Sequence, residues 1–119
     1  MITEYGKQLR KIRIDNEEVL RDMAERIGVT SAYVSAIEIG KRPIPENFTN
    51  LIIQEYGLND VQSEALRVAE ERSLTVLKLA IKDTSIVKRQ AAAVFAREFE
   101  NLNEDTANKI LKILNKGKG

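Results

Sequence analysis

The chain has 119 residues, a formal net charge of +1, and 43% hydrophobic, 31% charged and 5% aromatic residues. That length fits one compact domain or a small domain with an appendage, and the composition is too apolar for a disordered chain. The absence of cysteine and histidine excludes disulfides, catalytic triads, Cys–His dyads and ordinary zinc sites. We therefore expect neither an enzyme nor a bound cofactor or metal.

No stretch of the chain predicts membrane insertion. The longest apolar runs, such as Ala91 to Ala96, are far shorter than the roughly 20 residues that span a bilayer. The first residues also lack the basic-then-apolar layout of a signal peptide. We expect a cytoplasmic protein that does not contact a membrane.

Apolar residues recur at helical spacing five times within residues 1–72, which predicts five helices. Side chains that cap helix starts stand beside four of these stripes: Thr3, Thr30, Asn47 and Asn59. Asn59 and Gln62 also have the spacing of a capping box. Three glycines mark expected helix ends: Gly28, Gly40 and Gly57.

Residues 20–39 have the layout of a helix-turn-helix. An eight-residue helix is followed by a three-residue turn, residues 28–30, and the next helix begins at once. Ala24 allows the two helices to cross closely, and Gly28 can take the left-handed conformation that turns the chain. Four branched apolar residues complete the expected core between the helices: Ile27, Val29, Val34 and Ile37.

Residues 6–57 resemble the helix-turn-helix domain of the XRE family, the phage repressor and Cro-like regulators. The matching positions are Leu9 to Arg13, Met23 and Ala24, Ile27 to Val29, Tyr33 to Ser35, Ile37 and Glu38, and Gly40 to Pro43. The run YVSAIEIGKRP, residues 33–43, is the most specific part. The resemblance implies an all-α, five-helix lambda-repressor-like domain over residues 1–72, with its third helix in the major groove of double-stranded DNA.

The resemblance also implies roles for single residues on the third helix. Base edges would be met by Ser31, Ala32 and Ala36, with Thr30, Tyr33 and Ser35 beside them. This face carries no Arg, Asn or Gln, the residues that make the strongest bidentate base contacts. DNA shape and backbone contacts are therefore expected to count for more than base readout.

Charged residues near the third helix receive two further roles from the resemblance. Lys41 and Arg42 would contact phosphates, and Arg13 and Glu38 would form a buried ion pair. The chain departs from the family at Leu20, where a polar residue usually contacts a phosphate. Arg21 or the start of the second helix would have to supply that contact.

Residues 73–119 form a second predicted part, with nine basic and five acidic side chains. Residues 74–81 are β-rich and predict either a short strand or an extended connector. Two amphipathic helices follow and form a helical hairpin with a break at residues 101–103. Asn103 would cap the last helix and Gly117 would end it, while Glu104 and Asp105 favour the helix dipole rather than a metal site.

The second part offers a surface for self-association. The candidate dimerisation residues are apolar: Leu74, Val76, Phe95, Phe99, Ile110 and Leu114. An exposed strand could also pair with its copy. Alternatively, this part packs against the first five helices, or it binds a ligand or a partner protein.

Together these features predict a sequence-specific DNA-binding transcriptional regulator. The simplest mode of action is repression, with a homodimer occupying a palindromic operator. One alternative is the antitoxin of a toxin–antitoxin pair, whose C-terminal part holds a partner protein. Another is a protein-interaction module that keeps the fold without binding DNA.

Overall fold

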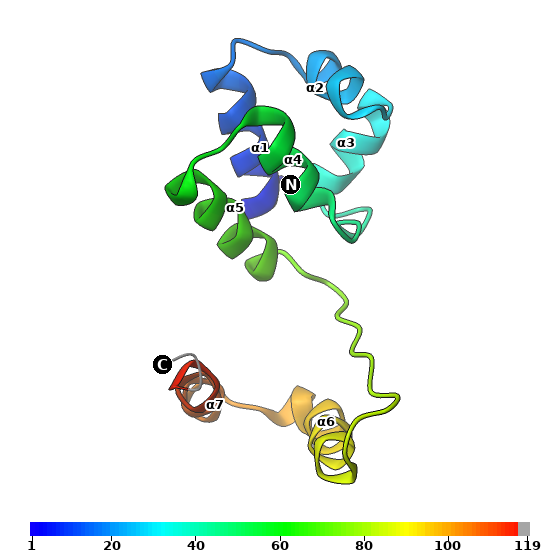
Figure 1. Ribbon diagram of the computed structural model, residues 1–119, viewed down its shortest axis with the longest axis vertical. Coiled ribbons are helices and arrows are strands. Elements are labelled where there is room, and N and C mark those ends of the chain that lie inside the picture. Colours follow the sequence, from blue (N-terminus) through cyan, green and yellow to red (C-terminus); the bar gives the residue numbers. More distant parts are fainter. Residues whose placement is uncertain (117–119) are drawn as a thin grey trace. The chain divides into compact units, whose positions relative to one another are not determined.

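The computed structural model describes residues 1–116, which fold into helices joined by connections without strands (Figure 1). The helices are α1 (Glu4–Asp15), α2 (Leu20–Ile27), α3 (Ser31–Glu38), α4 (Phe48–Tyr56), α5 (Asp60–Arg72), α6 (Ile86–Glu98), the short 3-10 helix η1 (Phe99–Asn101) and α7 (Glu104–Lys116). The predicted all-α class is confirmed over this range. The expected helix end at Gly117 lies outside the described residues.

Local capping signals explain where several helices begin. The Thr3 hydroxyl accepts a hydrogen bond from the Gly6 N–H at 3.0 Å, so α1 starts where the sequence predicts. Asn59 and Gln62 form the expected capping box at the start of α5, with bonds of 2.8 and 3.0 Å. Asn47 precedes α4 but makes no side-chain cap bond, and its backbone is left-handed with φ of 66°.

The contacts divide the chain into two units, of which the first is Met1–Leu77. In this unit α1 packs on α3 and α5, α2 packs on α3 and α4, and α4 packs on α5 (Figure 1). The largest fully buried side chains come from all five helices: Tyr5, Leu9, Met23, Val34, Ile37, Ile52 and Leu66. The apolar stripes read from the sequence therefore meet in one core.

Three hydrogen-bonded side chains, on α1, α4 and α5, join these helices within the core. Thr49 donates its hydroxyl hydrogen to Glu70, so the Tyr5 hydroxyl, 2.8 Å away, donates to Thr49. Burial raises the pKa of the Tyr5 hydroxyl far above its ordinary value, which keeps it neutral and able to donate. The Tyr5 N–H also donates to Ser73 Oγ at 3.0 Å, holding the end of α5 against the start of α1.

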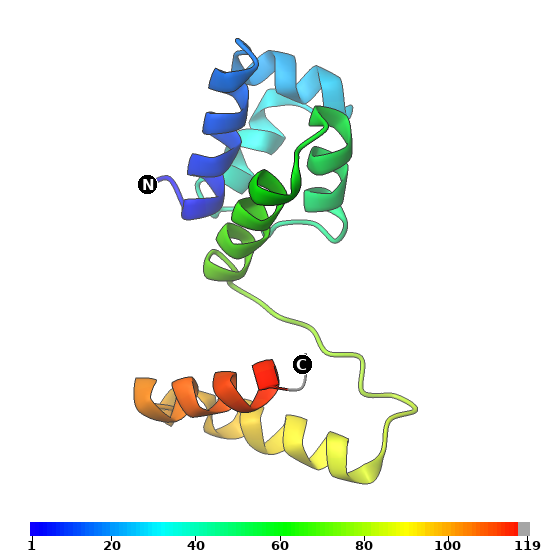
Figure 2. The same cartoon turned by 60° about the vertical axis from the view of Figure 1, so that its left-hand side comes forward.

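The segment between α5 and α6 contains neither helix nor strand (Figure 2). Residues 74–81 therefore form a connector, the second of the two predicted alternatives, and not a strand. A strand needs a neighbouring strand to take up its backbone hydrogen bonds, and none is present among residues 1–116. Leu74 and Val76 are exposed in this segment.

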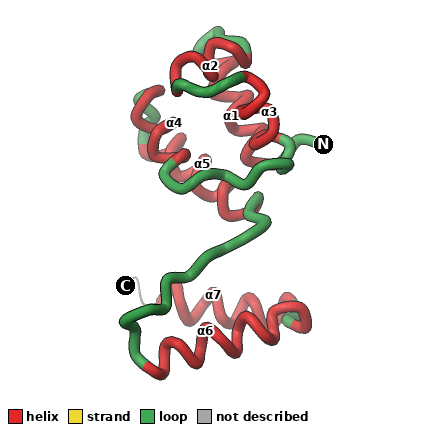
Figure 3. The backbone as a smooth tube through the Cα atoms, turned by 90° about the vertical axis from the view of Figure 1, so that its right-hand side faces the viewer, coloured by secondary structure: helices red, strands yellow, loops and turns green. Residues whose placement is uncertain are grey.

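The second unit begins at Lys78 and contains α6, η1 and α7. α6 and α7 run in opposite directions (Figure 3), as the predicted hairpin requires, but they make few contacts with each other. Ser85 caps α6 through the Lys88 N–H, and Asn103 accepts from the Thr106 N–H at the start of α7. In the described part of the chain, no helix is both long and apolar enough to cross a membrane.

Candidate nucleic-acid interface

Helix α3 buries one side and leaves its N-terminal face open. Val34, Ile37 and Glu38 are buried, whereas Ala32 is exposed. The other candidate base-reading residues on the helix are half-buried: Ser31, Tyr33, Ser35 and Ala36. All five candidates on α3 therefore keep some accessible surface beside one another.

Thr30 begins this helix and is already engaged by it. Its hydroxyl oxygen accepts a hydrogen bond from the Tyr33 N–H at 3.0 Å, which is the expected N-cap. The side chain is exposed, so its hydroxyl hydrogen stays free to be donated to a neighbouring molecule. At the other end of the preceding turn, Gly28 is left-handed with φ of 78°, as the turn requires.

Backbone hydrogen bonds hold the loop after α3 against the end of that helix. Gly40 turns the backbone with φ of 77°, and the next two amides return to one carbonyl of the helix. The Lys41 N–H and the Arg42 N–H donate to the Ala36 carbonyl at 2.9 and 3.2 Å. Both cations therefore project from a backbone bound directly to α3.

Arg42 is also held by its side chain. Its guanidinium carbon lies 4.7 Å from the centroid of the Tyr33 ring, a cation–π contact. Tyr33 itself is half-buried against the core. The ring thus positions Arg42 beside α3, a role for Tyr33 that the sequence pattern did not indicate.

The charges around α3 suit an anionic ligand. From Ile27 to Pro45 the only acidic residue is Glu38, and its side chain is 4% exposed. Lys41 and Arg42 are exposed. Residues 27–45 therefore present two accessible cations and no accessible carboxylate, which favours a phosphate ligand.

Glu38 forms the ion pair that joins α1 to α3. The Arg13 guanidinium donates to both carboxylate oxygens, the longer bond being 3.3 Å, and the Arg13 side chain is 9% exposed. A second cation, Arg10, lies 3.7 Å from the same carboxylate but is largely exposed. Arg13 also donates to Met23 Sδ on α2 at 3.4 Å, so this residue of α1 contacts both helices of the helix-turn-helix segment, α2 and α3.

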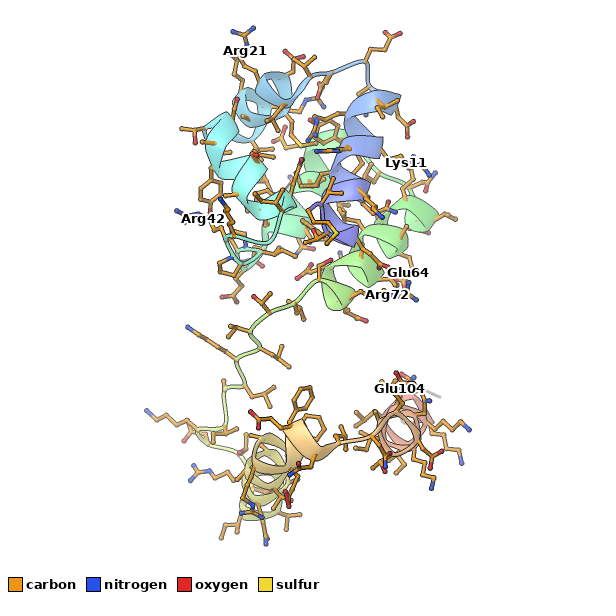
Figure 4. All side chains as sticks on the ribbon, turned by 180° about the vertical axis from the view of Figure 1, so that it is seen from behind. Lys11, Arg21, Arg42, Glu64, Arg72 and Glu104 are labelled. Atoms are coloured by element: carbon orange, nitrogen blue, oxygen red, sulfur yellow. The ribbon has the colours of Figure 1, made fainter. Side chains whose placement is uncertain are left out.

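The start of α2 differs from the pattern implied by the resemblance. Leu20 packs in part against the core, which explains an apolar residue there. The Asp22 carboxylate accepts from the Val19 N–H at 2.8 Å, so a negative charge already occupies the helix start. Arg21 is exposed and is the cation of this turn (Figure 4).

Two contacts that position α3 were missed by the sequence analysis. The Thr3 N–H and hydroxyl both donate to the Glu38 carbonyl at 2.9 Å. Gly6 lies where a Cβ atom would be 2.3 Å from that same carbonyl oxygen. A glycine inside a predicted helix was the available signal, because glycine lowers helix stability and needs a packing reason.

The candidate dimerisation residues are divided between the two units. Leu74 and Val76 belong to the first unit, and the remaining four belong to the second unit. There, Phe95 and Phe99 place their ring centroids 5.5 Å apart. Leu114 is exposed and Ile110 is half-buried.

Comparison with protein-family models, curated proteins and solved structures found no match for this chain.

Proposed function

We propose that this chain is a sequence-specific double-stranded DNA-binding transcriptional regulator with an XRE-type helix-turn-helix, in which α3 enters the major groove. The proposal depends chiefly on one observation, the loop of Lys41 and Arg42 bound to the Ala36 carbonyl beside the open face of α3. Cations fixed at one end of a short helix with one open face can contact the DNA backbone while that face meets base edges.

Repression by a homodimer is the simplest action for such a domain. A single eight-residue helix can contact only a few base pairs, so one domain alone specifies too short a sequence. Two copies related by a two-fold axis read two half-sites about 34–36 Å apart and so require a palindromic operator. Occupying that operator would block transcription without any further activity.

The two exposed cations give the first test. We expect Lys41→Ala with Arg42→Ala to weaken binding to every duplex. A plot of the logarithm of the binding constant against the logarithm of the salt concentration should also become less steep, by about 0.9 in its slope for each phosphate that is no longer neutralised. Fluorescence anisotropy at several salt concentrations measures both quantities. The matched control is Lys7→Ala with Lys11→Ala on α1, where Figure 4 places Lys11 on the opposite side of the unit from Arg42. Equal slopes for the wild type and the loop variant would contradict phosphate contact.

Tyr33 gives a second test, which separates positioning from readout. Tyr33→Ala removes both the hydroxyl and the ring under Arg42. We expect it to weaken specific binding by about 1–3 kcal/mol, the value of a good base contact, and binding to random duplex by less. Tyr33→Phe keeps the ring, so it should leave random-duplex binding and its salt dependence unchanged. If Tyr33→Ala weakened binding to the specific and the random duplex equally, Tyr33 would not contribute to base readout.

A further inference from the structure

The second unit has helices but no core of its own. None of the described residues from 78 to 116 is buried. Large apolar side chains that are at least 38% exposed occur on every element: Ile86, Val87, Val94, Phe95, Phe99, Leu111, Ile113 and Leu114. Helices of 13 residues are marginal in water when nothing packs on them. Another surface must therefore cover this unit.

Several exposed or half-buried apolar residues form one stripe on each helix. On α6 and the η1 turn that continues it, the stripe includes Val87, Ala91, Phe95 and Phe99, each four residues from the last. On α7 it consists of Ala107, Ile110, Leu111 and Leu114. Residues at these spacings share a helix face. Because α6 and α7 make few contacts with each other, both stripes are open to a partner, and two copies would supply the four amphipathic helices of a bundle.

Charge is divided between the two ends of the hairpin. At the open end, the first turn of α6 and the last two turns of α7 carry four basic residues and no acidic one: Lys88, Arg89, Lys112 and Lys116. Asp83 lies in the turn just before α6. At the closed end, from residue 98 to residue 105, they are all acidic: Glu98, Glu100, Glu104 and Asp105. The one ion pair found within this unit, over the residues described, joins Asp105 to Lys109 at 3.2 Å. Most of these charges are therefore available to a partner.

We infer that a second copy of this chain covers the hairpin in an antiparallel arrangement, with the closed end of each hairpin against the open end of the other. A two-fold axis then sets the acidic end of each copy against the basic end of the other, at both ends of the bundle, and buries the apolar stripes between them. A parallel arrangement would instead set acid against acid and base against base. The inference deepens the proposed function, since it names the interface of the expected homodimer, but the association needs no DNA.

The first arm of the test measures association of the full chain by sedimentation, without DNA. The wild type is expected to be a dimer. Lys88→Glu with Arg89→Glu makes the open end less basic, and we expect at least tenfold weaker dimerisation. These changes add acidic residues to the first turn of α6, where they favour the helix dipole, so loss of the helix does not explain the result. The control is Lys7→Glu with Lys11→Glu in the first unit, which should leave the dimer unchanged.

The second arm measures orientation and uses the absence of native cysteine. Val87→Cys marks the open end and Asn101→Cys marks the closed end. Mixed copies should form a disulfide between Cys at 87 and Cys at 101, whereas each variant alone should not, because like ends lie roughly 20 Å apart along a 13-residue helix. A monomeric wild type, an open-end variant that dimerises as well as the control, or disulfides between like ends would each overturn the inference. A dimer that binds no DNA would uphold it and overturn only the proposed function.

Discussion

Replacing Arg13 by methionine is expected to lower the free energy of unfolding by on the order of 3–5 kcal/mol, because it leaves the Glu38 carboxylate buried without its main partner. Small domains are stable by only about 5–15 kcal/mol, so this loss is a large fraction of the stability of the first unit. Urea unfolding followed by circular dichroism measures it. The exposed Arg10 is too weakly coupled to compensate.

Two further variants show whether the buried charge is the cause. Arg13→Met combined with Glu38→Leu removes both charges and should recover most of the stability, since an apolar pair of similar volume can replace a buried ion pair. Arg10→Met removes the exposed cation beside the same carboxylate and should cost less than about 1 kcal/mol. A double variant as unstable as Arg13→Met would show that shape, and not charge, explains the effect.

Gly6→Ala is expected to destabilise the protein although it improves helix propensity. In an open helix this change would stabilise by about 1 kcal/mol. Here the added Cβ would lie 2.3 Å from the Glu38 carbonyl oxygen and 2.9 Å from the Glu38 Cα, so α1 and α3 must move apart. Overpacking of this kind costs about 1–3 kcal/mol or more, and thermal unfolding should show a lower Tm.

Whether Gly6→Ala raises or lowers the Tm shows which matters more at this position, the helix propensity of the residue or the packing of α1 against α3. Lys7→Ala, at the exposed neighbouring position, tests helix propensity without any contact to α3 and should change stability by less than about 0.5 kcal/mol. If Gly6→Ala raised the Tm, the close approach of α1 to α3 would be wrong. Because that approach also positions α3, a destabilised Gly6→Ala protein should bind specific DNA more weakly.

The features that the sequence predicted well are caps and turns, in which the interacting residues lie only a few positions apart. Thr30 accepts from an amide three residues later, and Asn59 and Gln62 cap each other over the same separation. Gly28 is left-handed because the chain must turn there before α3. Such interactions need only the local spacing of residue types, which a sequence displays directly.

Contacts between distant residues could not be derived in the same way. Tyr5 meets Thr49 across 44 positions, and Gly6 meets Glu38 across 32. These depend on how α1, α3 and α4 pack, which local spacing does not specify. The contact of Arg42 with Tyr33 likewise depends on the loop returning to Ala36. The ion pair of Arg13 and Glu38 was expected only through the family resemblance, which supplied the packing that the pattern alone lacked.

The most direct test of the central claim is selection of bound duplexes from a random double-stranded pool by the full chain at physiological salt. The account predicts enrichment of an inverted repeat with half-sites one helical turn apart. It also predicts that the variant carrying Lys41→Ala and Arg42→Ala, which should fold normally, enriches the repeat far less. If the folded wild-type chain enriched no sequence, the proposal that α3 reads DNA would be wrong.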